Sequence, residues 1–128
     1  MLKRQAIWIA ACLGLFVQQE IASAQPNQDM QSAYHLLVGC REFINLNFHD
    51  GTDGTAFLQG FEQGLCAGHV AAITHFGQHY GVCSPEKITV VQAARVIVVY
   101  IDQRPARMHE RFTDLALEAL QQAWPCRR

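Results

Sequence analysis

Four cysteines spread along the chain constrain its fold more than any other feature. Cys40, Cys66, Cys83 and Cys126 are separated by 26, 17 and 43 residues. Zinc ribbons bring their ligands in local C-x-x-C pairs, and no two of these cysteines lie so close together. An even number of cysteines in a small exported domain is typical of a disulfide framework, for which four cysteines allow three pairings.

The first 24 residues predict that the chain is exported. Lys3 and Arg4 precede an uncharged apolar run over residues 6–17, and a small-x-small site follows at residues 22–24. The apolar run is shorter than the ~20 residues that a bilayer-spanning helix needs. This order of features predicts a signal peptide over residues 1–24, cleaved after Ala24, and one domain over residues 25–128 with no membrane span after cleavage.

A fifth cysteine, Cys12, offers an alternative to this cleavage site. It follows Ile9-Ala10-Ala11, which resembles a lipoprotein cleavage box. The residues after it, 13–17, are all apolar or glycine, whereas a lipidated terminus is normally followed by a polar tether. We therefore favour cleavage after Ala24 and assign Cys12 to the apolar part of the signal peptide.

The composition argues against several classes of function. Cleavage after Ala24 would leave 104 of the 128 residues, enough for one domain, with a formal charge of about −2 once Lys3, Arg4 and Glu20 are removed. No basic patch indicates nucleic-acid binding, and no G-x-S-x-G motif indicates a hydrolase. With all four remaining cysteines expected in disulfides, no catalytic thiol is left, and we predict a protein that is not an enzyme.

Two histidines are the best candidates for a metal site. His75 and His79 have the i, i+4 spacing that could hold a metal on one helical face. The glutamate and the third ligand of a zincin are missing, and Gly77 lies between the two histidines. We therefore predict no metal and no cofactor.

The pattern of apolar residues predicts an all-α fold, a small disulfide-stapled bundle of about four helices. The first helix is expected over residues 29–43 with Asp29 as its cap, and the second over residues 53–75. Thr89 and Gln92 form a capping box for the third helix, which is apolar nearly all round and should lie centrally. The fourth helix is expected to begin at Pro105 and to end at Trp124.

A row of small residues on the second helix requires an explanation. Gly60, Gly64, Gly68 and Ala72 recur every four residues, although each glycine inside a helix costs ~1 kcal/mol relative to alanine. We expect a neighbouring helix to approach the backbone closely along this row. A ligand groove over the glycines is the alternative.

The helix order favours one of the three disulfide pairings. A short turn at residues 103–105 should place the third and fourth helices antiparallel, so that Cys83 before the third meets Cys126 after the fourth. Cys40 and Cys66 then join the first two helices. A bond from Cys66 to Cys83 is less favoured, because the second helix carries the chain away from Cys66 before it turns.

The second half of the chain resembles a known family. The elements that carry the resemblance are Cys66-x-Gly68-His69-Val70, Cys83-Ser84-Pro85, the run Ile88-Thr89-x-x-Gln92-x-x-x-Val96-x-Val98-x-Tyr100-Ile101-x-x-x-Pro105, and then His109, Leu115, Ala119-Leu120 and Ala123-Trp124-Pro125-Cys126. Together they look like the Tai/Rap immunity protein family, over roughly Cys40 to Cys126. The chain departs from the family pattern at His69, where an aromatic residue is usual, at Ala72, where glycine is common, and at Trp124, where phenylalanine is more usual.

The resemblance implies a function and a partner. Members of this family are periplasmic helical proteins, often homodimers, that bind and inhibit peptidoglycan amidase toxins delivered by type VI secretion. The expected partner is therefore a cognate secreted cell-wall amidase. Inhibition needs a rigid domain that inserts a loop or a helix end into the active-site groove of the toxin.

Polar connections between the expected helices are the candidate contact surface. The candidate residues are Asp50, Thr52 and Asp53 in the first connection and Gln103, Arg104 and Arg107 in the last. The first connection lacks the alternating acidic ligands and the final glutamate of a calcium loop, so we interpret it as a turn and a helix cap.

A second hypothesis comes from another class of protein. Small disulfide-linked helical proteins of the periplasm include acid-stress chaperones, and six histidines in a chain that is 50% apolar would suit opening at low pH. Loss of a dimer together with client binding near pH 3 would favour this alternative. A gene for a secreted amidase next to this one would favour immunity.

Overall fold

The computed structural model describes residues 28–46 and 54–127. Its elements are α2 (Gln28–Gln31), α3 (Ala33–Asn45), α4 (Gly54–Phe76), the 3-10 helix η1 (Gly77–Tyr80), α5 (Val90–Asp102), the 3-10 helix η2 (Pro105–Arg107) and α6 (Phe112–Ala123). The described chain contains no β-strand, and the predicted all-α fold with four main helices is confirmed. The predicted signal peptide at residues 1–24 lies outside the described residues.

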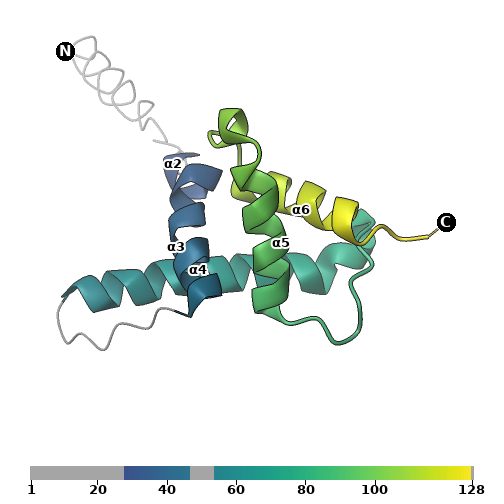
Figure 1. Ribbon diagram of the computed structural model, residues 1–128, viewed down its shortest axis with the longest axis horizontal. Coiled ribbons are helices and arrows are strands. Elements are labelled where there is room, and N and C mark those ends of the chain that lie inside the picture. The colour runs from purple at the N-terminus through teal and green to yellow at the C-terminus, as the bar shows by residue number, and fades with distance from the viewer. Residues whose placement is uncertain (1–27, 47–53, 128) are drawn as a thin grey trace, which may run out of the picture.

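The longest helix, α4, forms the base of the molecule. Figure 1 shows α3 and α5 lying side by side across α4, and α6 leaving the end of α5 to cover the C-terminal half of α4. α3 and α5 run antiparallel, and the ion pair between Arg41 and Asp102 joins them at their exposed edge. The N-terminal half of α4 extends beyond α3 (Figure 1).

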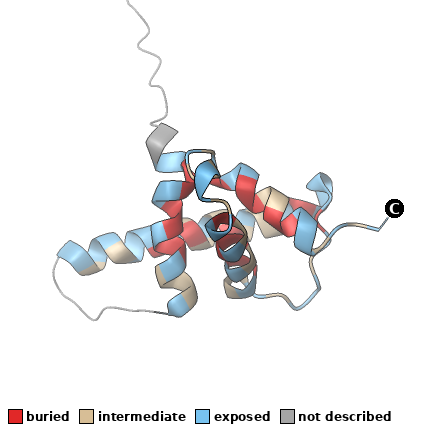
Figure 2. Cartoon of the chain, turned by 45° about the horizontal axis from the view of Figure 1, so that its top comes forward, coloured by how far each residue is buried: buried red, intermediate tan, exposed pale blue. Residues whose placement is uncertain are grey.

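The buried residues gather where the four helices cross (Figure 2). α5 and α6 each contribute five apolar residues to this core, α3 contributes four and α4 two, and α5 packs against all three of the other main helices. Full burial of a leucine- or phenylalanine-sized side chain stabilises a fold by about 1.5–3 kcal/mol. The largest fully buried apolar side chains are Leu37, Val70, Val82, Ile97, Ile101, Phe112, Leu115 and Leu120.

Two disulfides form in the pairing that the sequence favours. Cys40 of α3 bonds to Cys66 of α4, and Cys83 bonds to Cys126 beyond α6. α6 crosses α5 (Figure 1), however, so the antiparallel arrangement expected from a short turn is wrong. The second pair meets because two backbone hydrogen bonds align the flanking segments, from Cys83 N to the Trp124 carbonyl (2.8 Å) and from Cys126 N to the Gly81 carbonyl (3.1 Å).

The first predicted helix is broken at Ser32, so the single helix expected over residues 29–43 is wrong, and Asp29 lies inside the short α2 and not before it. Ser32 is extended, with φ −67° and ψ 152°, and its side chain makes no capping bond to the helix. The free N–H groups of the first turn of α3 are satisfied by tertiary contacts: Ala33 N donates to the Glu110 carbonyl (2.8 Å) and Tyr34 N to the Met108 carbonyl (2.9 Å). A helix end must find such partners, and here the α5–α6 connection supplies them.

The sequence predicts the start of α5 correctly but not the start of α6. The Thr89–Gln92 capping box of α5 is present in both directions, which confirms that prediction. The start of the fourth helix at Pro105 is wrong, because Pro105 begins the short η2 and α6 begins only at Phe112. The carbonyls of Met108 and Glu110 cap α3 and so lie outside a continuous helix.

The row of small residues on α4 faces open space. A Cβ atom added at Gly60, Gly64 or Gly68 would meet no atom of the described residues within 4 Å, so the predicted close approach of a neighbouring helix along this row is wrong. The close approach occurs instead at Gly39 of α3, where an added Cβ would lie 2.5 Å from the carbonyl carbon of Glu62 and closer still to its oxygen. The glycine that lets α3 and α4 cross is therefore on the other helix, next to the Cys40–Cys66 bond.

Candidate partner-contact site at the connection between α5 and α6

The connection from Gln103 to Arg111 is held in place by its backbone. It contains η2, and the N–H of Arg104 donates to the Ile101 carbonyl (2.8 Å), which closes the end of α5. Its far end caps α3 through the Met108 and Glu110 carbonyls. The connection is therefore anchored to two helices and can present its outer side chains in one arrangement.

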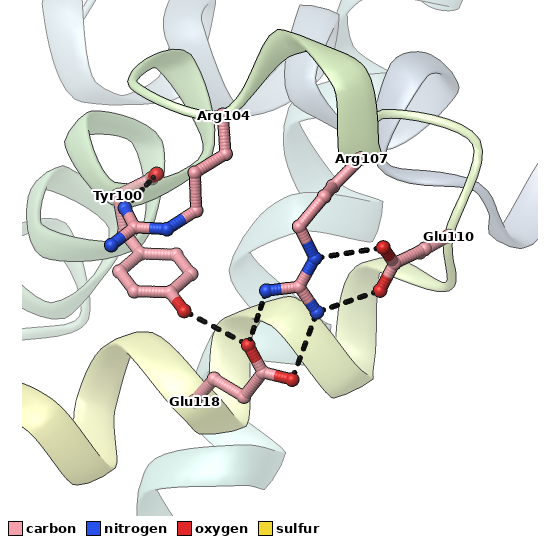
Figure 3. A network of polar contacts seen from close by, with 5 residues as sticks. All are labelled: Tyr100, Arg104, Arg107, Glu110 and Glu118. Atoms are coloured by element: carbon pink, nitrogen blue, oxygen red, sulfur yellow. Dashed lines mark hydrogen bonds and ion pairs between the residues drawn. The ribbon is translucent and has the colours of Figure 1, made fainter.

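Arg107 organises the inner face of this connection (Figure 3). Its Nε and Nη2 donate to the two oxygens of Glu110, each at 2.7 Å. Its Nη1 and Nη2 donate to the two oxygens of Glu118 on α6, at 2.7 and 3.0 Å. Such bidentate arginine–carboxylate pairs are among the stronger polar contacts in proteins, and this one joins η2 to α6.

The shared hydrogen bonds shift the pKa of Arg107, Glu110 and Glu118 so that the charged form of each is favoured. Arg107 and then the Tyr100 hydroxyl, which donates to Glu118 Oε2 at 2.8 Å, lower the pKa of Glu118 to about 2. Arg107 also lowers the pKa of Glu110, and the two carboxylates raise the pKa of Arg107. All three groups therefore stay charged at neutral pH.

Arg104 lies on the outer side of the same network. Its guanidinium carbon lies 3.6 Å from the centre of the Tyr100 ring, and its Nη1 donates to the Tyr100 carbonyl at 2.8 Å. Figure 3 shows the guanidinium over the ring, and the tyrosine hydroxyl pointing away from it towards Glu118. In the part of the chain that the structure describes, Arg104 forms no ion pair.

A shallow groove of about 290 Å³ runs beside Arg104, between α5 and α6. Its walls are mostly small or aliphatic, and Gln103 and Gln122 also line it. Arg104 is its only charged lining residue among those described. The apolar lining includes Val96, Val99, Ala119 and Ala123.

The candidate contact residues fall into three groups. Gln103 is exposed and Arg104 half-buried beside the groove, so both remain available to a partner. Arg107 is engaged by two internal carboxylates, which makes it a structural residue of the connection. Asp50, Thr52 and Asp53 lie outside the described residues.

Sequence reasoning missed the aromatic and acidic members of the site. Glu110 follows Arg107 at the i, i+3 spacing typical of a helical ion pair, and this spacing could have indicated it. Glu118 and Tyr100 lie 11 and 7 positions from Arg107. They come together only because α6 crosses α5, a geometry that no local pattern encodes.

The structure separates the two histidines that were the candidates for a metal site, and it places His69 against the core. α4 ends at Phe76, so His75 belongs to α4 and His79 to η1, and they do not share a face of one α-helix. His69 Nδ1 lies 2.8 Å from the Leu65 carbonyl, and its ring meets Phe112 edge to face at 6.2 Å. The unusual histidine thus packs against the core as an aromatic ring would.

Two features expected of other classes of protein are missing from residues 28–46 and 54–127. No group of three or more histidine, cysteine or acidic side chains there could hold a metal ion. None of the helices in these ranges is both long and apolar enough to cross a bilayer.

Comparison with known proteins gives one match. No curated protein and no solved structure matches the chain. The family model of Rap1a immunity proteins matches residues 32–126, which is most of the chain and contains every main helix and both disulfides. The chain therefore belongs to the Rap1a immunity proteins.

Proposed function

We propose that this protein is a periplasmic immunity protein that binds and inhibits a peptidoglycan amidase toxin of type VI secretion. The observation that carries the proposal is the family match over residues 32–126. On this proposal the protein has no enzymatic activity of its own and acts by occupying the toxin. Its signal peptide is removed after Ala24, so that the mature protein meets the toxin in the periplasm.

Two structural features support an inhibitor of this kind. Disulfides persist in oxidising compartments such as the bacterial periplasm, and this domain has two. The connection between α5 and α6 is anchored at both ends and carries exposed Gln103 and half-buried Arg104. A binding surface that is ordered in advance loses less entropy when the partner binds.

Calorimetry with the amidase encoded beside this gene tests the proposal. We expect tight binding of the oxidised mature protein and loss of peptidoglycan cleavage at equimolar ratio. A Gly64→Ala variant, altered on an open face of α4, is the matched control and should bind equally well. Failure to bind any co-encoded toxin, or hydrolysis by the protein alone, would contradict the proposal.

The exported location has its own test. We expect the mass of the protein recovered from the periplasm to correspond to a chain that begins at Gln25 and has two disulfides. A mass increased by lipid at Cys12, or an uncleaved chain in the cytoplasm, would contradict this part of the proposal.

A homodimer belongs to the same proposal. The N-terminal half of α4 exposes three large apolar side chains, Phe57 (73% exposed), Leu58 (60%) and Phe61 (50%). Exposed apolar clusters of this kind often mark protein interfaces. Sedimentation should give a dimer for the native protein and a monomer for Phe57→Ser/Phe61→Ser, whereas Phe76→Ser, similarly exposed at the other end of α4, should remain dimeric.

A further inference from the structure

We infer that the groove between α5 and α6 is a receptor for a carboxylate side chain, with Arg104 as the residue that binds it. The inference rests on the proposed function for the identity of the partner, whose surface would supply the aspartate or glutamate. Four observations carry it: the fixed position of Arg104, its unpaired charge, the apolar groove beside it, and the absence of a carboxylate among the described lining residues.

The guanidinium of Arg104 is positioned before any partner binds. The Tyr100 ring stacks on one face of the guanidinium, whose carbon lies 3.6 Å from the ring centre. The Tyr100 carbonyl accepts a hydrogen bond from Nη1 of Arg104 at 2.8 Å. A free arginine side chain loses considerable rotamer entropy when it is fixed, and here the stacking already limits that freedom. Its remaining N–H groups can still donate to a carboxylate, which arginine binds through two parallel hydrogen bonds.

The charge of Arg104 is the one that the network leaves without a direct partner. Glu118 lies near enough to influence it, but both oxygens of Glu118 accept from Arg107, and one also accepts from Tyr100. Both oxygens of Glu110 accept from Arg107 as well. The second arginine of the connection therefore engages the nearby carboxylates and leaves Arg104 to attract an anion from outside.

The lining of the groove indicates which side chains of the partner should lie next to the bound carboxylate. Val96, Val99, Ala119 and Ala123 line it with methyl groups, and Val99 is 55% exposed although it is a large apolar residue. The amides of Gln103 and Gln122 can donate or accept beside them. These features fit an acidic side chain next to an aliphatic one, presented by a protein segment.

The inference can be tested without the toxin, by titrating two blocked tripeptides into the isotopically labelled protein. The probes are acetyl-Val-Glu-Val-amide and acetyl-Val-Gln-Val-amide, which differ only in charge. We expect the glutamate peptide to bind in the millimolar range and to shift the NMR signals of the Arg104 Nε–H and the Val99 methyl groups, with the glutamine peptide about fivefold weaker or worse. Equal shifts from both peptides, or shifts confined to other residues, would overturn the inference.

Substitutions separate the role of Arg104 from general positive charge. Arg104→Gln should remove the difference between the two peptides, and Arg104→Lys should keep part of it, because lysine keeps the charge but not the fork of donors. Arg111→Gln is the matched control: Arg111 is 69% exposed, pairs with Asp114 at i, i+3, and should not matter. If Arg104→Gln does not fold, the comparison of the two peptides on the native protein still decides the question.

Binding to the co-encoded amidase distinguishes this inference from the proposed function. If the amidase binds the native protein and Arg104→Gln equally well, and the peptides bind alike, the receptor is wrong while the immunity function stands. If the glutamate peptide binds selectively but no co-encoded amidase binds, the receptor stands and the proposed partner is wrong. The receptor and the proposed partner both stand if the glutamate peptide binds selectively, the amidase binds, Arg104→Gln weakens amidase binding and Arg111→Gln leaves it unchanged.

Discussion

The two disulfides close loops of comparable length in very different surroundings. Cys40–Cys66 closes 26 residues and joins α3 to α4 in the core, with both cysteines fully buried. Cys83–Cys126 closes 43 residues and joins two segments outside the helices, where Cys83 is exposed. We refer to them as the inner and the outer disulfide.

On loop length alone, the outer disulfide would stabilise the fold slightly more than the inner one. Loop-closure entropy gives ~3.5 kcal/mol for the inner bond and ~4 kcal/mol for the outer one. The difference is smaller than the effect of packing, because the inner sulfurs fill space between buried side chains and the outer cysteines are partly in solvent. Burial, more than loop length, should therefore decide which bond stabilises the fold more.

Removing each disulfide tests that ranking and should give the largest effects. We expect Cys40→Ala/Cys66→Ala to lower the free energy of unfolding by about 4–5 kcal/mol, because the loss of packed sulfur adds to the entropic term. Cys83→Ala/Cys126→Ala should lower it by about 3–4 kcal/mol. Chemical denaturation of the three proteins measures both values, and the reverse order would show that loop length decides.

Mild reduction should separate the two bonds in one sample. A thiolate must reach a sulfur to attack it, and of the two disulfides only the outer one has an exposed cysteine. We expect a low concentration of dithiothreitol to open Cys83–Cys126 first and to leave a folded protein with two modifiable thiols. Mass spectrometry after alkylation identifies them, and early labelling of Cys40 or Cys66 would contradict this order.

Two glycines allow a packed face of α3 to be compared with an open face of α4. Gly39→Ala places a methyl group against the backbone of Glu62, so we expect it to lower the free energy of unfolding by about 2–3 kcal/mol. Gly64→Ala is the matched control on an open face and should raise it by about 0.5–1 kcal/mol through helix propensity. Thermal unfolding measures both, and destabilisation by Gly64→Ala would reveal a contact on that face that the isolated chain does not show.

Local patterns in the sequence predicted the features that are local in the structure. The capping box at Thr89, the apolar character of α5 and the end of α6 follow from residues a few positions apart. The disulfide pairing was also predicted correctly, although the antiparallel packing of the last two helices from which it was argued is wrong.

The predictions that failed share one physical cause, which is contact between distant segments. Ser32 breaks the first helix where the carbonyls of Met108 and Glu110, more than 70 residues away, accept its neighbours' N–H groups. Gly39 gave no periodic signal, whereas the regular row on α4 did, yet the crossing of the two helices placed the contact at Gly39. In the candidate site, Arg104 and Arg107 belong to the same connection, and the positions of Glu110 and Glu118 separate the structural arginine from the available one.

The apolar core and the connection between α5 and α6 should also differ in their response to pH, and this difference should be the smallest of the expected effects. The core contains apolar packing and the inner disulfide, whereas the connection depends on the ion pairs of Arg107 with Glu110 and Glu118. Because Arg107 and Tyr100 lower the pKa of Glu118 to about 2, from an ordinary value of 4.5, this carboxylate stabilises the fold above pH 4.5. That contribution declines as the pH falls from 4.5 towards 2. Since Glu118 is partly exposed, solvent screening keeps the effect modest.

Glu118→Gln should therefore lower Tm at pH 7, and the difference from the native protein should shrink below pH 4.5 and disappear near pH 2. Asp114→Asn is the matched control, because it breaks an exposed i, i+3 pair with Arg111 and should leave Tm nearly unchanged at every pH. Thermal unfolding across this range of pH measures the difference directly. A Glu118→Gln difference that stays constant down to pH 2 would mean that the side chain acts through its shape and packing, and the contrast between an apolar core and an ionic α5–α6 connection would then fail.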